Sequence, residues 1–249
     1  MNRDNLTKAV PAERARPARH MMPMETTVAF DVYGTMIDTQ AITAVLRDYL
    51  AGRTASDFAK VWREKLLEYS FRRGLMRQYE TFAVCAGQAF SFTCARFNLH
   101  LHEDDRERIL NAYALLPAYP DVQAALERLR AAGFRLYAFS NGSAEAVSKV
   151  LFHAGLGACF LDVVSVDDVR SFKPDPAVYR HFLKRASAAG RSAWLVSGNP
   201  FDVIGALSAG MNAAWVKRSA DMPFDPWGIE PTLTVHGLDD LAGKLVAPR

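Results

Sequence analysis

The stretch TTVAFDVYGTMIDTQ, residues 26–40, decides the fold assignment because an apolar, β-prone segment ends there in a carboxylate. Thr26 to Phe30 predicts a short buried strand. Asp31 follows at once, with Gly34 and Thr35 in a tight turn behind it. A carboxylate at the end of a buried strand costs free energy unless it is hydrogen-bonded or put to use. Asp31 is therefore the first candidate functional residue.

Outward from this strand, the chain from residue 119 onward alternates helical stretches with apolar strands. Such alternation is typical of βαβ crossovers and predicts an α/β fold with a doubly wound, parallel-sheet (Rossmann-like) core, to which the strand at 26–30 also belongs. The expected helices are 119–132, 143–154, 175–184 and 200–209, and the expected strands are 135–140, 160–166, 193–198 and 213–218.

Between the first strand and this alternating region, the pattern is helical only. Tyr79, Phe82, Ala86, Phe90, Thr93 and Phe97 recur at spacings of three and four residues. About eighty such residues are too many for one crossover, so the sequence predicts an inserted all-helical cap domain. The predicted divisions are a disordered tail at 1–24, a core at 25–38 and 118–249, and the cap at 39–117.

Composition excludes several classes of partner. Of 249 residues, 50% are apolar, and no apolar run approaches the roughly 18 residues of a membrane span. The net charge of +3 lies in residues 1–24, which hold five Lys/Arg and two Asp/Glu, so residues 25–249 carry 25 of each sign. We therefore expect neither a nucleic-acid nor a membrane partner. Three cysteines without metal-ligand spacing predict reduced thiols and a cytoplasmic protein.

Each predicted strand is followed by polar side chains. In open parallel sheets, ligands bind at the carboxyl ends of the strands. Alternatively, Ser140 and Asn141 could simply cap a helix. Lys173 could likewise be an ordinary surface lysine. The coincidence at four strand ends favours an active site, with Asp31 as nucleophile, Lys173 keeping it ionised, and Asp202 orienting the lysine or a water. The four clusters are Asp31, Tyr33 and Thr35; Ser140 and Asn141; Lys173 and Tyr179; and Ser197, Asn199 and Asp202.

Four motifs, FDVYGT, SNGS, FKPDPAVY and VSGNPFD, together resemble those of the haloacid dehalogenase superfamily, over residues 25–245. Most members are phosphatases with a second aspartate where this chain has Tyr33. In phosphate ester cleavage that aspartate protonates the leaving group while magnesium offsets charge. A halide leaves without protonation, so Tyr33 disfavours a phosphatase. We therefore expect the reaction to need no metal ion and no cofactor.

The segment VWREKLLEYSFRRGLMRQYETF, residues 61–82, resembles the corresponding segment of L-2-haloacid dehalogenases. The resemblance implies hydrolysis of short (S)-2-haloalkanoates to (R)-2-hydroxy acids through an ester on Asp31, with Arg63 receiving the halide, and a homodimer. The catalytic residues that it implies are Asp31, Thr35, Arg63, Lys173, Ser197, Asn199 and Asp202. The substrate-binding residues that it implies are Tyr33, Arg63, Leu67, Phe82, Ser140, Asn141, Tyr179 and Phe201.

Three positions depart from the family's usual residues. Glu64 replaces an uncharged amide, Phe201 a tryptophan, and Gly198 a serine. An acid beside an anion pocket is unhelpful unless it points away or pairs with a neighbour such as Lys65. It would instead suit a cationic substrate, so hydrolysis of azetidine-2-carboxylate, a reaction of a relative of the dehalogenases, is the alternative. A phosphatase is a more distant one.

Overall fold

The computed structural model describes residues 26–246 of the 249-residue chain, so the predicted tail at 1–24 lies outside the described residues. A parallel sheet forms the centre, with strand order β3-β2-β1-β4-β5-β6. This order is that of a doubly wound sheet, because the chain starts in the middle and extends to both edges. The strands are β1 Thr27–Phe30, β2 Arg135–Ser140, β3 Asp162–Ser165, β4 Ala193–Ser197, β5 Asn212–Val216 and β6 Leu233–Val235.

Strand β1 occupies the interior of the sheet, and all four of its residues are buried. It pairs in parallel with β2 on one side and β4 on the other, so Thr27 faces both Arg135 and Ala193. Two-sided burial explains its unbroken apolar run. Asp31 consequently emerges between the carboxyl ends of β2 and β4.

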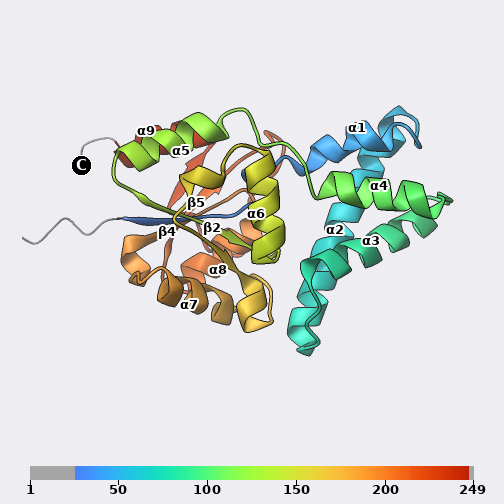
Figure 1. Cartoon of the computed structure of the whole chain (residues 1–249). Helices are drawn as coiled ribbons and strands as arrows, with labels where there is room; N and C mark the ends of the chain where they lie inside the picture. Colours follow the sequence, from blue (N-terminus) through green and yellow to red (C-terminus); the bar gives the residue numbers. More distant parts are fainter. Residues whose placement is uncertain (1–25, 247–249) are drawn as a thin grey trace, which may run out of the picture.

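Helices cover both faces of the sheet. Figure 1 shows α5 and α9 on one face and α7 and α8 on the other, while α6 packs against β2 and β3. The predicted doubly wound α/β core is thereby confirmed. The bounds are α5 Val122–Ala131, α6 Ala144–His153, α7 Pro176–Arg185, α8 Pro200–Ser208 and α9 Leu238–Val246.

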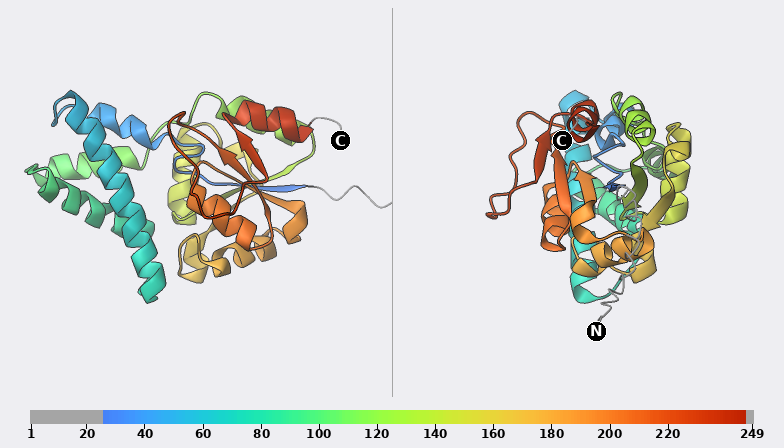
Figure 2. Two further views of the ribbon diagram at one scale, coloured as in Figure 1. Left: turned by 180° about the vertical axis from the view of Figure 1, so that it is seen from behind. Right: turned by 90° about the vertical axis from the view of Figure 1, so that its left-hand side faces the viewer.

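The segment between β1 and α5 is helical and lies beside the carboxyl edge of the sheet, as Figure 1 and the left view of Figure 2 show. We call residues 42–113 the helical insert. None of the helices among residues 26–246 is long and apolar enough to cross a membrane. The helices of the insert are α1 Ile42–Leu46, α2 Gly52–Met76, α3 Phe82–Arg96 and α4 Glu103–Tyr113.

Two faces of helix α2 contact different parts of the protein. One packs on α3, where the Trp62 and Phe90 ring centroids lie 4.8 Å apart and those of Phe58 and Phe90 5.7 Å apart. Residues four apart share a helix face, so Arg63 and Leu67 lie together on another face, which lines a pocket at the sheet edge. One helix thus serves both the core of the insert and the pocket.

The sequence patterns miss the last two elements, β6 and α9. Strand β6 spans three residues and only its last is buried, which is too short for an alternating pattern to be read. Strand β3 is shorter than the expected 160–166, because Val166 already begins a 3-10 turn capped by the Ser165 hydroxyl. The other predicted elements agree with the structure to within a few residues.

Candidate active site

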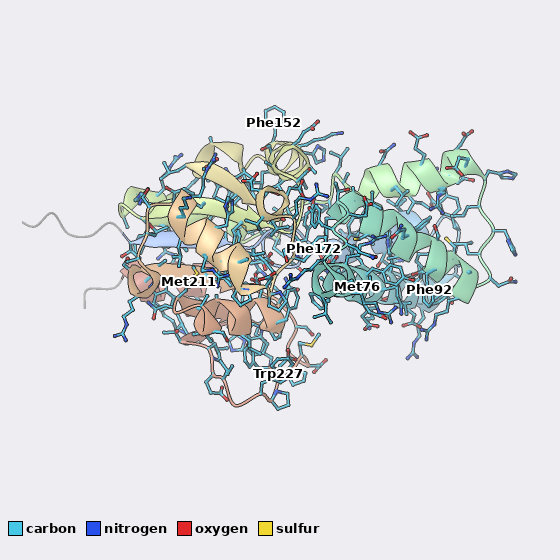
Figure 3. All side chains as sticks on the ribbon, turned by 90° about the horizontal axis from the view of Figure 1, so that it is seen from below. Met76, Phe92, Phe152, Phe172, Met211 and Trp227 are labelled. Atoms are coloured by element: carbon cyan, nitrogen blue, oxygen red, sulfur yellow. The ribbon has the colours of Figure 1, made fainter. Side chains whose placement is uncertain are left out.

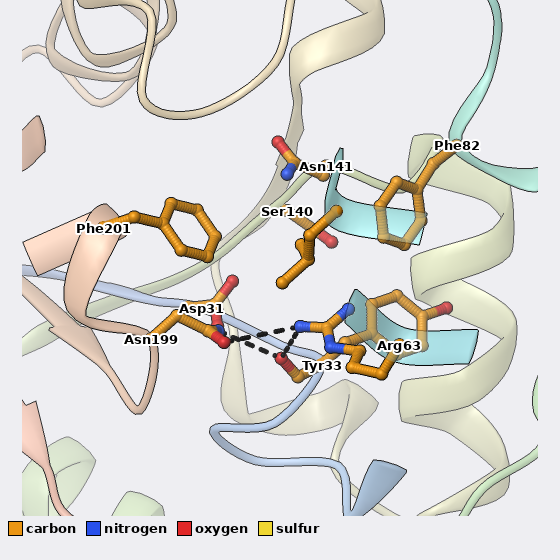
Figure 4. Close-up of a pocket in the computed structure, with 9 residues that line it drawn as sticks. Asp31, Tyr33, Arg63, Phe82, Ser140, Asn141, Asn199 and Phe201 are labelled. Carbon is orange, nitrogen blue, oxygen red and sulfur yellow. Dashed lines mark hydrogen bonds between the residues drawn. The ribbon is translucent and has the colours of Figure 1, made fainter. Parts of the chain in front are cut away.

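A small pocket opens where the carboxyl edge of the sheet meets the helical insert. Its volume is about 220 Å³, including the part open to solvent. A space of this size suits a small molecule. Figure 4 shows its lining, which consists of Asp31, Tyr33, Arg63, Leu67, Phe82, Ser140, Asn141, Asn199 and Phe201.

Asp31 is the one acid of this lining, and its two carboxylate oxygens have different environments. Oδ2 accepts hydrogen bonds from Thr35 Oγ1 at 2.6 Å, Asn199 Nδ2 at 2.7 Å and Ser197 Oγ at 3.3 Å. Oδ1 accepts one, from Lys173 Nζ at 3.2 Å. Three donors fix Oδ2, whereas Oδ1 keeps lone-pair capacity for an incoming group.

Lys173 lies behind Asp31 with 1% of its side chain exposed. Its ammonium also donates to Asp202 Oδ2 and to the Phe139 carbonyl, both at 2.9 Å. Burial alone would lower the pKa of Lys173, but Asp202 and Asp31 outweigh burial and raise that pKa. Burial raises the pKa of Asp202; Lys173 opposes that rise and Asp31 adds to it. The lysine therefore stays charged, and its ammonium lies between the carboxylates of Asp31 and Asp202.

Tyr179 stands behind this pair and does not line the pocket, although the resemblance implies that it binds substrate. Its fully buried hydroxyl donates to Asp202 Oδ1 at 2.8 Å. Gly205 leaves the space it needs, since a Cβ there would lie 2.3 Å from the Tyr179 hydroxyl. The structure thus places Tyr179 as a support for Asp202.

Arg63 approaches from the helical insert. Its Nη2 donates to the Tyr33 carbonyl at 3.0 Å and to Asn199 Oδ1 at 3.4 Å. Among the described residues, Arg63 Nη1 and the Tyr113 hydroxyl are the buried side-chain atoms that meet no partner at hydrogen-bond geometry. The two groups are neighbours, because Arg63 opposes the rise that burial causes in the pKa of Tyr113. Buried polar atoms are normally paired. The guanidinium therefore retains donor capacity for an anion.

Ser140 ends β2 and Asn141 follows it. Neither caps the next helix, because the Ser143 hydroxyl accepts from Ala146 N at 3.2 Å and caps α6. Ser140 Oγ accepts from Gly142 N at 3.1 Å, which leaves its own proton free to donate. Asn141 Oδ1 accepts from Lys173 N at 2.9 Å. Both side chains are held at the pocket wall.

Apolar side chains complete the enclosure. Phe82 and Phe201 lie on opposite sides of the pocket (Figure 4). Phe71, one further turn along α2 from Leu67, packs edge-on against Phe201 with centroids 5.0 Å apart. The ring of Tyr33 lies 6.0 Å from that of Phe82. Water is largely displaced from such walls, which strengthens the electrostatic interactions inside.

The structure explains two of the three positions that depart from the family's usual residues, Glu64 and Gly198. Glu64 is exposed and does not line the pocket, because it lies about 100° around α2 from Arg63. Lys65, its expected partner, instead pairs with Glu68 at 2.5 Å. At Gly198, a Cβ would lie 2.4 Å from the Gly34 carbonyl oxygen, so this close approach of two loops requires glycine.

A divalent cation does not fit the donor set of this pocket. Hard cations take several oxygen ligands, but Asp31 already contacts the Lys173 ammonium, and Tyr33 presents a phenol in place of a second carboxylate. Burial raises the pKa of Tyr33 far above its ordinary value, so the phenol is neutral. Over residues 26–246, no group of three or more His, Cys, Asp or Glu side chains is arranged to hold a metal.

The site also contains residues that sequence patterns did not single out. Tyr113, at the end of α4, stacks on Tyr33 with ring centroids 6.3 Å apart and an interplanar angle of 12°. Arg218, just after β5, binds the Thr35 carbonyl. A search for polar side chains after β5, like that made at the other strand ends, would find Arg218. No comparable signal marks Tyr113.

Known proteins resemble this chain along most of its length. (S)-2-haloacid dehalogenase 2 of Pseudomonas sp. (strain CBS-3) is 36% identical over 88% of this chain and 94% of its own. Haloacetate dehalogenase H-2 of Moraxella sp. (strain B) is 34% identical over 85% of this chain and 94% of its own. The solved structure of L-2-haloacid dehalogenase from Xanthobacter autotrophicus with chloropropionic acid covalently bound superposes with a TM-score of 0.84, at 29% identity, covering 91% of this chain and all of that one.

The family model described as haloacid dehalogenase-like hydrolase matches residues 25–210, well over half of the chain. By that match, the chain belongs to the haloacid dehalogenase-like hydrolases.

Proposed function

We propose that this protein hydrolyses short (S)-2-haloalkanoates to (R)-2-hydroxy acids and halide. One observation carries the proposal: Asp31, whose Oδ1 has a single hydrogen-bond donor, lines a small pocket together with the guanidinium-bearing side chain of Arg63. A nucleophile opposite a cation is the arrangement that displacement of an anion requires. The names of the relatives support the substrate class.

In the first step, Asp31 Oδ1 attacks the α-carbon from the side opposite the halogen. The carbon–halogen bond breaks, and its electron pair leaves with the halide toward Arg63 and Asn199. Attack from behind inverts the α-carbon and leaves an ester on Asp31. Thr35, Ser197 and Asn199 hold Oδ2 and so fix the direction of Oδ1.

In the second step, water attacks the ester carbonyl carbon, the hydroxy acid leaves, and Asp31 is regenerated with one oxygen from water. Asp202 takes one proton from this water, and that proton passes to the alkoxide oxygen of the hydroxy acid as it leaves. The second proton of the water is released when the regenerated Asp31 ionises. Burial raises the pKa of Asp202 above its ordinary value, which makes its carboxylate a stronger base than a solvent-exposed aspartate. Lys173 and Tyr179 hold Asp202 in place.

The substrate carboxylate binds at the ends of β1 and β2. Ser140 Oγ donates to it together with the backbone N–H groups of Tyr33 and Asn141. Within residues 26–246, these two N–H groups donate to no backbone carbonyl, so an anion satisfies them. Leu67, Phe82 and Phe201 surround the alkyl chain.

The helical insert acts in this proposal as the predicted cap domain, because it brings Arg63 over the pocket. We also place the protein in the cytoplasm as a homodimer. Its three cysteines are unpaired, as in a reducing compartment. Exposed apolar side chains on α2 and α3, including Met76 and Phe92 (Figure 3), support self-association through the insert.

The direct test is release of halide from (S)-2-chloropropionate by the purified protein, with the (R)-enantiomer as control. We expect halide and (R)-lactate in equal amounts from the (S)-substrate, and none from its mirror image. Absence of halide release from several short (S)-2-haloacids would contradict the proposal.

Arg63→Ala and Glu64→Gln form a matched pair on one helix turn. Loss of the Arg63 guanidinium is expected to slow dehalogenation about a hundredfold, or roughly 3 kcal/mol, because the developing halide loses its cation. Glu64→Gln is expected to leave the rate nearly unchanged, since Glu64 is exposed and lies outside the pocket lining.

The same pair tests the alternative reaction. If the substrate were the ring ammonium acid azetidine-2-carboxylate, Glu64→Gln would weaken its hydrolysis, and wild-type dehalogenation would be negligible. Steady-state rates of both variants on both substrates distinguish these outcomes. The exposed position of Glu64 disfavours the alternative.

Dehalogenation is expected to proceed at full rate in the presence of EDTA. The motivation is the donor set, with Tyr33 in place of a second acid and Lys173 on Asp31. The measurement compares kcat for 2-chloropropionate and for a generic phosphate monoester, with EDTA and with added magnesium. The protein would instead be a phosphatase if EDTA abolished activity and magnesium restored it. Substantial turnover of the phosphate monoester would indicate the same.

A further inference from the structure

Arg218 contacts the backbone of the loop that carries the nucleophile. It lies two residues after β5, and 14% of its side chain is exposed. Its guanidinium donates twice to the Thr35 carbonyl oxygen, from Nε at 3.0 Å and from Nη2 at 2.8 Å. Two donors on one carbonyl fix that peptide in position and direction.

Arg218 is itself held on its remaining sides. Nη1 donates to Asp121 Oδ1 at 2.9 Å and Oδ2 at 2.7 Å, and the guanidinium lies 4.2 Å from the centroid of the Tyr119 ring. Asp121 Oδ2 also accepts from Leu238 N at 2.6 Å, which ties the pair to the start of α9. Burial would raise the pKa of Asp121, but the hydrogen bonds from Arg218 and Leu238 lower it below the ordinary value. The pair is therefore charged at neutral pH.

The side chain of Thr35 links this clamp to Asp31. Its hydroxyl donates to Asp31 Oδ2 at 2.6 Å and accepts from Gly198 N at 2.7 Å. Thr35 is fully buried, so water cannot replace either hydrogen bond. Any shift of the Thr35 peptide therefore moves the donor that lies at the shortest distance from the nucleophile.

We propose that Arg218 is a positioning residue for the reaction: by clamping the Thr35 carbonyl, it fixes the Thr35 hydroxyl and through it the direction of the Asp31 carboxylate. Arg218 does not line the pocket and touches neither substrate nor Asp31. This inference rests on the proposed function for its kinetic test. It extends the site to β5 and α5, which supply no lining residue.

The kinetic test is a double-mutant cycle between Arg218→Ala and Thr35→Val on (S)-2-chloropropionate. Misplacement of a reacting group by about 1 Å costs on the order of a hundredfold, so we expect Arg218→Ala to lower kcat about ten- to a hundredfold with KM nearly unchanged. In the Thr35→Val background the same substitution is expected to cost less than about threefold, because coupled residues are not additive. Multiplicative losses in the double variant, or a lowered Tm with wild-type kcat, would overturn the proposal.

Two further variants keep this test decisive. Arg185→Ala removes another Arg–Asp pair, with Asp162 at 2.8 Å on the outer side of α7, and is expected to leave kcat unchanged. Arg218→Lys retains one cationic donor and is expected to recover part of the lost kcat. It replaces Arg218→Ala in the cycle if the alanine variant does not fold.

A readout without turnover separates this inference from the proposed function. The Gly198 N–H, which donates to Thr35 Oγ1, is expected to exchange with deuterium at least tenfold faster in the Arg218 variant, while amides of β2 keep their rates. Equal Gly198 exchange in variant and wild type would refute the role of Arg218. An inactive wild type would count against the proposed function alone, because Gly198 exchange still decides the role of Arg218.

Discussion

Asp31→Asn is expected to reduce turnover at least about ten-thousandfold, the scale of loss when a catalytic nucleophile is removed. An amide is a far poorer nucleophile than a carboxylate. The new NH₂ group would also face donors on either side, from Thr35 and Asn199 at Oδ2 and from Lys173 at Oδ1. The variant retains the size of the side chain, so its circular dichroism is expected to match wild type.

The covalent intermediate gives a second measurement. Rapid quenching of wild-type enzyme is expected to add the acyl fragment to the peptide that contains Asp31. A single turnover in H₂¹⁸O, with enzyme in excess, is expected to place the label in that peptide and not in the hydroxy acid. Label in the product, or an acyl group on any other peptide, would refute the ester on Asp31. Asp162→Asn, which alters a carboxylate remote from the pocket lining, serves as the control.

Lys173→Met is expected to lower kcat about a thousandfold, within the range attributed to preorganised electrostatic groups. The buried ammonium separates the carboxylates of Asp31 and Asp202. Without it, like charges face one another in a water-poor site, and one carboxylate takes up a proton. Protonation of Asp31 would remove the nucleophile, and protonation of Asp202 would remove the base. Lys184→Met, at an exposed position on α7, is the matched control.

The same variant is expected to move the pH range in which this site loses stability, from strongly alkaline pH in wild type to the range above pH 4. In wild type the pKa of Lys173 is raised, so its contribution is complete below the unfolded lysine value and is lost only at strongly alkaline pH. In Lys173→Met, burial and repulsion from Asp31 raise the folded-state pKa of Asp202, and only the hydrogen bond from Tyr179 still opposes that rise. The folded variant then binds a proton that the unfolded chain has released, so its free energy of unfolding falls above pH 4, by up to about 1.4 kcal/mol per pH unit.

Urea unfolding of both proteins at pH 5 and pH 8 measures this effect. The free energy lost by Lys173→Met, relative to wild type, is expected to be larger at pH 8 than at pH 5. A loss that is the same at both values would show that the lysine does not neutralise the acid pair.

How much of this site is readable from sequence depends on the range of each interaction. The clusters after β1, β2 and β4 were predicted because apolar strand patterns end at Phe30, Ser140 and Ser197, and parallel strands bring their carboxyl ends to one edge. Lys173 was found in the same way. The burial of the four residues of β1 follows from their composition alone.

Other features depend on contacts that no local pattern records. Arg218 reaches a carbonyl 183 residues earlier in the chain. Tyr179 turns to Asp202 because Gly205 opens the space beneath it. The outward direction of Glu64, by contrast, was available from helix geometry once Arg63 was assigned to the pocket, because adjacent residues on a helix do not share a face.

The interior position of β1 has a consequence for synthesis on the ribosome. Asp31 is made 142 residues before Lys173 and 168 residues before Asn199. At about 5 to 20 residues per second, roughly ten to thirty seconds separate the nucleophile from its partners. Throughout that interval the nascent chain carries an apolar strand whose neighbour β4 does not yet exist. An apolar strand without its partner is a segment at which an incompletely folded chain is prone to associate wrongly.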